Sequence, residues 1–146
     1  MEKKNTILGL DISTKTIGVA LFEEDGNLLE LTHISPRPKP KPETKIGELI
    51  GKADAFKTFI EKYKNLNISK VIIEEPLLRS NNVNTVGTLL RYNGMVSKIC
   101  YDILKVTPVY ISTYNSRKFA FPDLMVARKK GLKPVLFGGY DTKTDK

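Results

Sequence analysis

A long amphipathic segment divides the apolar stretches of this chain into two groups. Residues 44–64 carry apolar side chains at steps of three and four, the spacing of a helix with one buried face. Three apolar stretches precede this segment, and a fourth, residues 70–75, is the first to follow it. Strands on either side of such a helix can lie parallel in one sheet, because the helix supplies the crossover. The order of the segments therefore predicts an α/β fold.

The three apolar stretches before the helix predict an antiparallel meander. They comprise residues 5–12, 16–22 and 28–34, and short polar links separate them. Asp25-Gly26 in the second link is a strong hairpin signal. Because parallel pairing needs a much longer connection, these three strands should run in alternating directions.

A second helix is predicted over residues 84–104 and a fifth strand over residues 107–112. The resulting order, β-β-β-α-β-α-β, predicts a mixed five-stranded sheet with helices packed on it. In that sheet the strand at residues 7–11 should be central and parallel to the strand at residues 71–74.

The pattern weakens after Ser112. Short helices are expected at residues 114–121 and 123–130, and no element is expected over residues 131–146. The length of 146 residues and a hydrophobic content of 40% suit one domain with an ordinary core.

Charge and cysteine content limit the classes of function. Lys and Arg outnumber Asp and Glu by 24 to 16, which suits either a polyanionic partner or a basic soluble protein. With Cys100 and His33 as the single residues of their types, a metal site would have to use oxygen ligands. No apolar run reaches the length of a membrane span, and the N-terminus lacks the apolar core of a signal peptide, so we expect a cytoplasmic protein.

A proline-rich segment, PRPKPKP at residues 36–42, interrupts the periodic pattern. Alternating prolines predict a stiff, extended connector. Its lysines can contact a phosphate backbone, but a plain spacer is the favoured interpretation.

Two strands of the predicted sheet end in acidic residues. Asp11 ends the first strand, and KVIIEEPLL places Glu74 and Glu75 at the end of the fourth. Parallel neighbours bring their carboxyl ends to one edge, where Asp11 and Glu74 can meet. Close carboxylates repel each other unless a cation lies between them, and Mg²⁺ or Mn²⁺ fits because hard ions take oxygen ligands. Alternatively, each is a separate strand-end residue held by backbone donors.

These segments resemble the RuvC-like Holliday-junction resolvases of the RNase H-like superfamily. The first motif of that family resembles ILGLDISTKTIGVALF at residues 7–22, and the second is similar to VIIEEPLLRSNN at residues 71–82. The helix with LRYNG at residues 90–94 and the segment YISTYNSRK at residues 110–118 resemble the parts that follow. The resemblance covers residues 5–118 and combines two motifs in the expected order.

The resemblance implies an RNase H-like fold and a Mg²⁺- or Mn²⁺-dependent endonuclease that acts as a homodimer on branched DNA such as Holliday junctions. It makes Asp11 and Glu74 the catalytic metal ligands, whereas Glu75 falls on a position that need not be acidic. Candidate DNA contacts are Lys15, Arg79, Asn81, Asn82, Arg117 and Lys118.

One feature departs from the family pattern. The family carries further metal-binding aspartates on a C-terminal helix, whereas Asp141 and Asp145 lie here in a polar tail without apolar neighbours. We therefore expect a chain truncated before that helix, whose two carboxylates form an incomplete cage, so that residues 1–146 bind Mg²⁺ weakly and cleave DNA poorly. Two alternatives remain open: a nucleotide-binding domain of the actin-like ATPase and sugar-kinase type, and a non-catalytic RNase H-like DNA-binding module.

Overall fold

The computed structural model of the chain describes residues 4–76, 82–113, 115, 125–127 and 134–136. The chain divides into two compact units, residues 1–110 and 111–146. The single domain expected over residues 1–146 stays a prediction.

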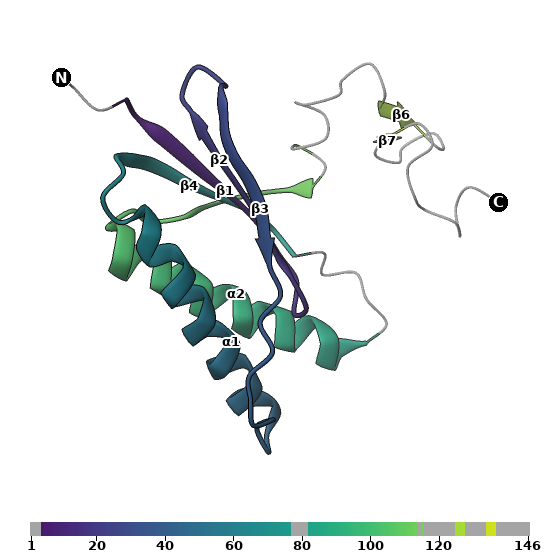
Figure 1. The fold of residues 1–146 in the computed structure, drawn as a ribbon. Helices are drawn as coiled ribbons and strands as arrows, with labels where there is room; N and C mark the ends of the chain where they lie inside the picture. Colours follow the sequence, from purple (N-terminus) through teal and green to yellow (C-terminus); the bar gives the residue numbers. More distant parts are fainter. Residues whose placement is uncertain (1–3, 77–81, 114, 116–124, 128–133, 137–146) are drawn as a thin grey trace. The chain divides into compact units, whose positions relative to one another are not determined.

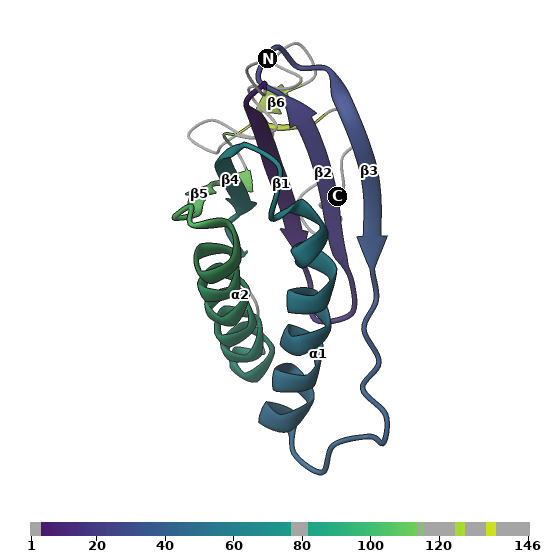
Figure 2. The same cartoon turned by 60° about the vertical axis from the view of Figure 1, so that its left-hand side comes forward.

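A five-stranded mixed sheet, in the strand order β3-β2-β1-β4-β5, organises the chain (Figures 1 and 2). Its strands are β1 (Thr6–Ile12), β2 (Ile17–Glu23), β3 (Leu28–Ile34), β4 (Ile68–Glu74) and β5 (Val109–Ile111). The central strand β1 pairs antiparallel with β2 and parallel with β4, and β2 pairs antiparallel with β3. The predicted sheet, with its meander and its central strand, is confirmed.

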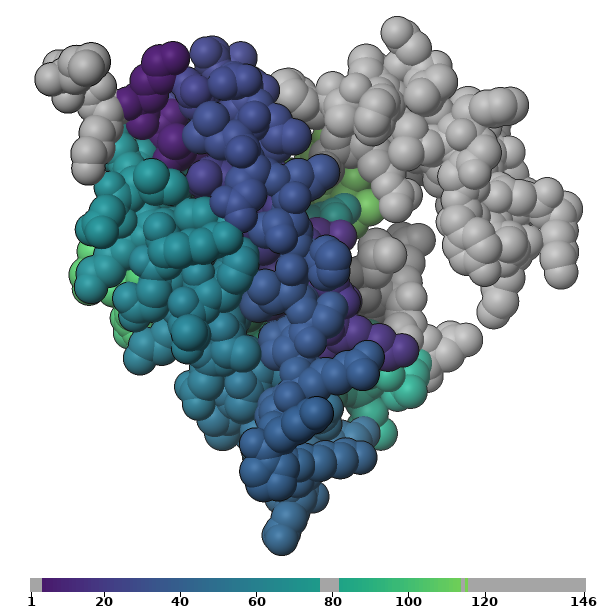
Figure 3. Space-filling model, viewed as in Figure 1, coloured from purple at the N-terminus to yellow at the C-terminus, as the bar shows by residue number. Residues whose placement is uncertain are grey.

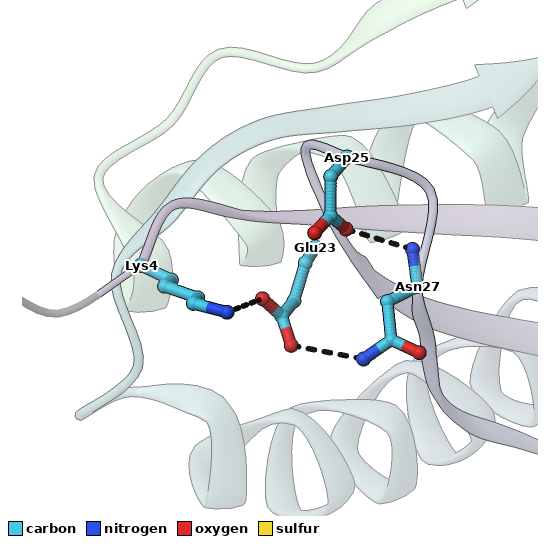
Figure 4. A network of polar contacts seen from close by, with 4 residues as sticks. All are labelled: Lys4, Glu23, Asp25 and Asn27. Carbon is cyan, nitrogen blue, oxygen red and sulfur yellow. Dashed lines mark hydrogen bonds and ion pairs between the residues drawn. The ribbon is translucent and has the colours of Figure 1, made fainter.

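Polar contacts hold the hairpin turn between β2 and β3 (Figure 4). The Glu23 carboxylate accepts a hydrogen bond from Asn27 Nδ2 at 3.0 Å and forms an ion pair with Lys4 Nζ at 3.0 Å. The backbone N–H of Asn27 donates to Asp25 Oδ1 at 2.9 Å. Gly26 has a φ of 96°, a backbone conformation that glycine adopts without strain. The Asp25-Gly26 turn is therefore built as the sequence predicts.

Two helices pack side by side on one face of the sheet (Figure 2). They are α1 (Lys45–Ile60), which continues as the short 3₁₀ helix η1 (Glu61–Tyr63), and α2 (Val83–Leu104). A side chain caps each N-terminus, since Thr44 accepts a hydrogen bond from Gly47 N and Asn82 accepts one from Thr85 N. No helix among the described residues combines the length and the apolar character that a membrane span needs.

The core lies between the helices and the sheet. From the strands it takes every second side chain, and from the helices one stripe each. Its buried members include Leu8, Leu10, Val19, Val71, Ile73, Phe56, Ile60, Tyr92, Val96 and Cys100. Burial raises the pKa of the Cys100 thiol to about 12. Cys100 is therefore a core residue.

The second unit corrects two expectations from the sequence. A strand, β6 (Met125–Ala127), lies where a helix was expected at residues 123–130, and it pairs antiparallel with β7 (Pro134–Leu136), where no element was expected. Strands of three residues are too short for periodicity to distinguish them from a helical turn. The helix expected at residues 114–121 lies largely outside the described residues.

The buried hydroxyl of Tyr92 provides a test of the helix packing. Tyr92 is 0% exposed, and its hydroxyl has no hydrogen-bond partner among the described residues. Because an unpaired buried hydroxyl is costly, Tyr92→Phe should raise the free energy of unfolding by about 1 kcal/mol, measured by urea denaturation.

Tyr110→Phe is the matched control. The Tyr110 hydroxyl donates to Asn93 O at 3.3 Å and shares a hydrogen bond with Ser97 Oγ. Its removal should lower the free energy of unfolding by about 1 kcal/mol. An equal loss in both variants would contradict the unpaired state of the Tyr92 hydroxyl.

Candidate metal and nucleic-acid site

The two predicted metal ligands lie at the same edge of the sheet. Leu10 of β1 is the parallel partner of Ile73 of β4, and Asp11 and Glu74 are the next residues along each strand. Neighbouring strands run about 4.8 Å apart, so this register brings the two carboxylates within reach of a common ion. The juxtaposition inferred from the order of elements is present in the structure.

Both carboxylates also belong to the same face of the sheet. Leu10 and Ile73 are buried against the helices, and strand alternation turns Asp11 and Glu74 to the face away from α1 and α2. Asp11 is exposed and Glu74 is half-buried. The residue opposite Asp11 on β2 is Gly18, where a Cβ atom would lie 3.6 Å from Asp11 Cβ. The missing side chain leaves space for a ligand to approach Asp11.

Glu75 occupies a different environment. It lines a cavity of about 290 Å³ on the α2 side, together with Pro76, Leu90, Asn93, Gly94 and Tyr110. The adjacent acids Glu74 and Glu75 therefore face different surroundings, as expected from strand alternation. Glu75 serves as an internal control for experiments on Glu74.

The turn between β1 and β2 follows directly after Asp11. Ser13 Oγ donates to Thr16 O at 2.8 Å and accepts from Thr16 N at 3.1 Å, which closes the turn on itself. Lys15 is exposed within it. The turn thus holds Lys15 in a fixed loop beside the edge that carries Asp11.

A lysine of α1 anchors this turn, and the sequence did not reveal it. Lys52 Nζ donates to Thr14 O and forms an ion pair with Glu48 at 3.4 Å, and its side chain is only 11% exposed. In the sequence Lys52 is one of many lysines on an amphipathic helix. Only the packing of α1 beside the turn shows that it positions the loop after Asp11.

The other candidate DNA contacts fall into two groups. Asn82 caps α2 through Thr85 N at 3.2 Å and lines a cavity of about 320 Å³ that Thr14 and Lys52 also line. Its capping role is structural, and its predicted DNA contact is untested. Arg79, Asn81, Arg117 and Lys118 lie outside the described residues, as do Asp141 and Asp145.

The donor set at this edge suits a hard divalent cation that keeps much of its water. Asp11 and Glu74 supply carboxylate oxygens, the ligand type that Mg²⁺ and Mn²⁺ prefer. Within the described part of the chain, no group of three or more His, Cys, Asp or Glu side chains is placed to hold a metal ion. Two carboxylates alone predict weak binding, with water completing the coordination.

The chain is similar to known proteins in structure but not in sequence. No family model and no curated protein sequence matches the chain. The structure of Thermus thermophilus RuvC in complex with a Holliday junction substrate is similar, with a TM-score of 0.60 and 10% identity over 84% of this chain and 71% of that chain. A second T. thermophilus RuvC structure has a TM-score of 0.53 and 16% identity over 77% and 67%.

Two further likenesses show how widely this fold is used. The yeast mitochondrial Holliday junction resolvase Ydc2 has a TM-score of 0.50 and 14% identity over 84% of this chain and 58% of its own. A ROK family transcriptional regulator has a TM-score of 0.50 and 16% identity over 81% of this chain, and the chain covers 31% of that protein. Identities this low establish the architecture alone. The chain has the mixed α/β fold of the RuvC and RNase H-like proteins.

Proposed function

We propose that this chain is a metal-dependent endonuclease that hydrolyses phosphodiester bonds in branched DNA. The observation that carries the proposal is the placement of Asp11 and Glu74 on one face, at the carboxyl ends of adjacent parallel strands. The fold shared with RuvC, whose structure holds a Holliday junction substrate, supports this choice of substrate class.

Each part of the site has a role in this proposal. Asp11 and Glu74 hold Mg²⁺ or Mn²⁺, which when bound lowers the pKa of water and offsets charge on the phosphate. The space beside Gly18 lets a DNA backbone approach the exposed Asp11. Lys15, in the turn fixed by Lys52, contributes positive charge next to the same edge.

The DNA partner is supported by charge, and the homodimer is supported by symmetry. A net charge of +8 favours a polyanion. Cutting two strands of a four-way junction requires two active sites, which a twofold-symmetric dimer provides. Native mass spectrometry of the complex with a four-way junction should show two protein chains per junction.

Cleavage of a labelled four-way junction tests the proposed function. Enzyme in excess over DNA, in millimolar Mg²⁺ or Mn²⁺, should produce cuts near the branch point, and EDTA should prevent them. A linear duplex of matched sequence should be cut more slowly. Binding of the junction without cleavage would instead favour a non-catalytic DNA-binding module.

A nucleotide-binding function is the second candidate, because LDISTK at residues 10–15, followed by a strand and the Asp25-Gly26 turn, also resembles the first phosphate motif of the actin-like ATPases and sugar kinases. In that case the turn at Ser13–Lys15 would contact a nucleotide phosphate. Thermal unfolding with and without MgATP separates the two candidates. We expect junction DNA, and not MgATP, to raise the Tm, and a rise with MgATP alone would favour nucleotide binding.

A further inference from the structure

The proline-rich segment between β3 and α1 is packed against the helix and is not a free spacer. We call residues 35–42 the strap. A Cβ atom on Gly51 would lie 2.8 Å from Pro38 Cγ, and one on Gly47 would lie 3.3 Å from Pro42 Cβ. Gly47 and Gly51 are four residues apart, so they share one face of α1. Two prolines of the strap therefore pack on a helix surface that lacks side chains.

Further contacts tie the strap and the helix to the turn after Asp11. Ser35 Oγ, at the start of the strap, shares a hydrogen bond of 2.8 Å with Thr16 Oγ1 of the turn. Lys52 of α1 donates to Thr14 O of the same turn. These contacts link the strap, α1 and the turn to one another. The strap lies at the lower end of the view in Figure 3.

Strap and turn together line a groove of about 590 Å³ that is rich in positive charge. Its cationic residues are Lys15, Arg37, Lys39, Lys41 and Lys52. Among the described residues that line it, Glu48 is the one acidic side chain, and it already pairs with Lys52. Four cations therefore repel each other around the groove, and a bound polyanion would relieve that repulsion.

We propose that this groove binds successive phosphates of a DNA strand that leads to the edge carrying Asp11 and Glu74. The inference rests on the proposed function for the identity of that strand. Lys15 links the two places, because it lines the groove and follows Asp11 by one short turn. The contacts of Pro38, Pro42 and Ser35 hold the groove in shape before DNA binds, which lowers the entropic cost of binding.

The chemistry of the strap favours a chain of phosphates over a single phosphate ion. Proline has no backbone N–H, so a segment with proline at every second position cannot surround one phosphate with backbone donors. The positive charge sits on long side chains spread along the strap. Such an array suits an extended backbone with charges at regular intervals.

Lys39→Gln/Lys41→Gln tests the groove directly. Fluorescence anisotropy of a labelled junction in EDTA reports binding without metal chemistry. The slope of log affinity against log salt is negative, and loss of two phosphate contacts should make it shallower by about 1.8. Between about 50 and 200 mM salt, the wild-type protein should then lose about tenfold more affinity than the variant.

Lys57→Gln/Lys64→Gln is the charge-matched control. Both lysines are exposed. Lys57 lies in the C-terminal half of α1 and Lys64 directly after η1, and neither lines the groove. This control should keep nearly the wild-type slope. If the two double variants behave alike, the groove is not a DNA-binding site and the inference is overturned. Absence of junction binding by the wild-type protein would overturn it as well.

Gly51→Ala tests the packing of the strap with all charges retained. The new methyl group would displace Pro38, so the affinity for the junction should fall. Gly87→Ala on α2 is the control, because a Cβ atom there meets nothing within 4 Å, and its affinity should not change. If Gly51→Ala binds the junction with the affinity of the wild-type protein, the packing of the strap on α1 has no role in DNA binding.

Failure of the groove and failure of the nuclease proposal give different results. Suppose that the wild-type protein cleaves the junction in Mg²⁺, while Lys39→Gln/Lys41→Gln binds it with the same salt dependence as Lys57→Gln/Lys64→Gln. The proposed DNA-binding groove is then contradicted, and the proposed nuclease activity is supported. The opposite result is that the wild-type protein never cleaves, while Lys39→Gln/Lys41→Gln still reduces the salt dependence of junction binding. In that case the proposed DNA-binding groove is supported and the proposed nuclease activity is contradicted.

Discussion

Asp11→Asn should reduce cleavage of a branched DNA by about 10³-fold or more, the scale of losing a group that stabilises transition-state charge. Asparagine keeps the size of the side chain and removes the negative charge that would hold the cation. Asp11 is exposed, so the fold should tolerate the change. DNA affinity should stay close to that of the wild-type protein, because the lysines supply most of it. Single-turnover cleavage and anisotropy on the same preparation measure both quantities.

Glu74→Gln should have the same effect on cleavage, and Glu75→Gln is its control. The two acids are adjacent in the sequence, but Glu75 lines the cavity beside α2. Glu75→Gln should therefore cleave at close to the wild-type rate. Full activity in Glu74→Gln would show that the carboxylates of KVIIEEPLL end the strand for a reason other than metal binding.

Phe56→Ala should lower the free energy of unfolding by about 3–5 kcal/mol. Phe56 is 0% exposed and lies in the core between α1 and the sheet, so its loss leaves a cavity. Urea denaturation monitored by circular dichroism measures the change.

Ile50→Ala on the same helix is the control for Phe56. Ile50 belongs to the apolar stripe expected from the sequence, yet it is 50% exposed in the structure. Its truncation should cost less than about 1 kcal/mol. Equal losses at the two positions would contradict the packing of α1 described above.

The order and pairing of strands could be predicted because local signals determine them. Alternation and short turns indicated β1, β2 and β3, and the helix before β4 required a crossover and hence a parallel neighbour. The meeting of Asp11 and Glu74 followed from that order alone. Side-chain chemistry at the carboxyl edge was therefore accessible from the sequence.

The buried faces of the helices were predicted less well. Leu90 lies in the apolar pattern of the helix predicted over residues 84–104 but is 47% exposed in the structure, whereas Tyr92 is fully buried. A periodic pattern gives the approximate direction of the apolar face. Which flank of that face meets the sheet depends on how α1 and α2 pack together, and no local pattern contains this information.

Side-chain contacts between the strap, α1 and the turn after Asp11 could not be predicted. The approach of Pro38 to Gly51 and the hydrogen bond from Lys52 to Thr14 join parts of the chain that carry no sequence signal for each other. The proline-rich segment was interpreted as a spacer because its composition shows stiffness but not what it packs against.

Direct measurement of Mn²⁺ binding tests the central claim, that Asp11 and Glu74 together hold a divalent cation. Electron paramagnetic resonance of free Mn²⁺ in titrations of the protein without DNA reports binding independently of cleavage. The wild-type protein and Glu75→Gln should bind Mn²⁺ weakly and alike, and Asp11→Asn/Glu74→Gln should show no binding at the same concentrations. Unchanged Mn²⁺ affinity in Asp11→Asn/Glu74→Gln would contradict the metal site.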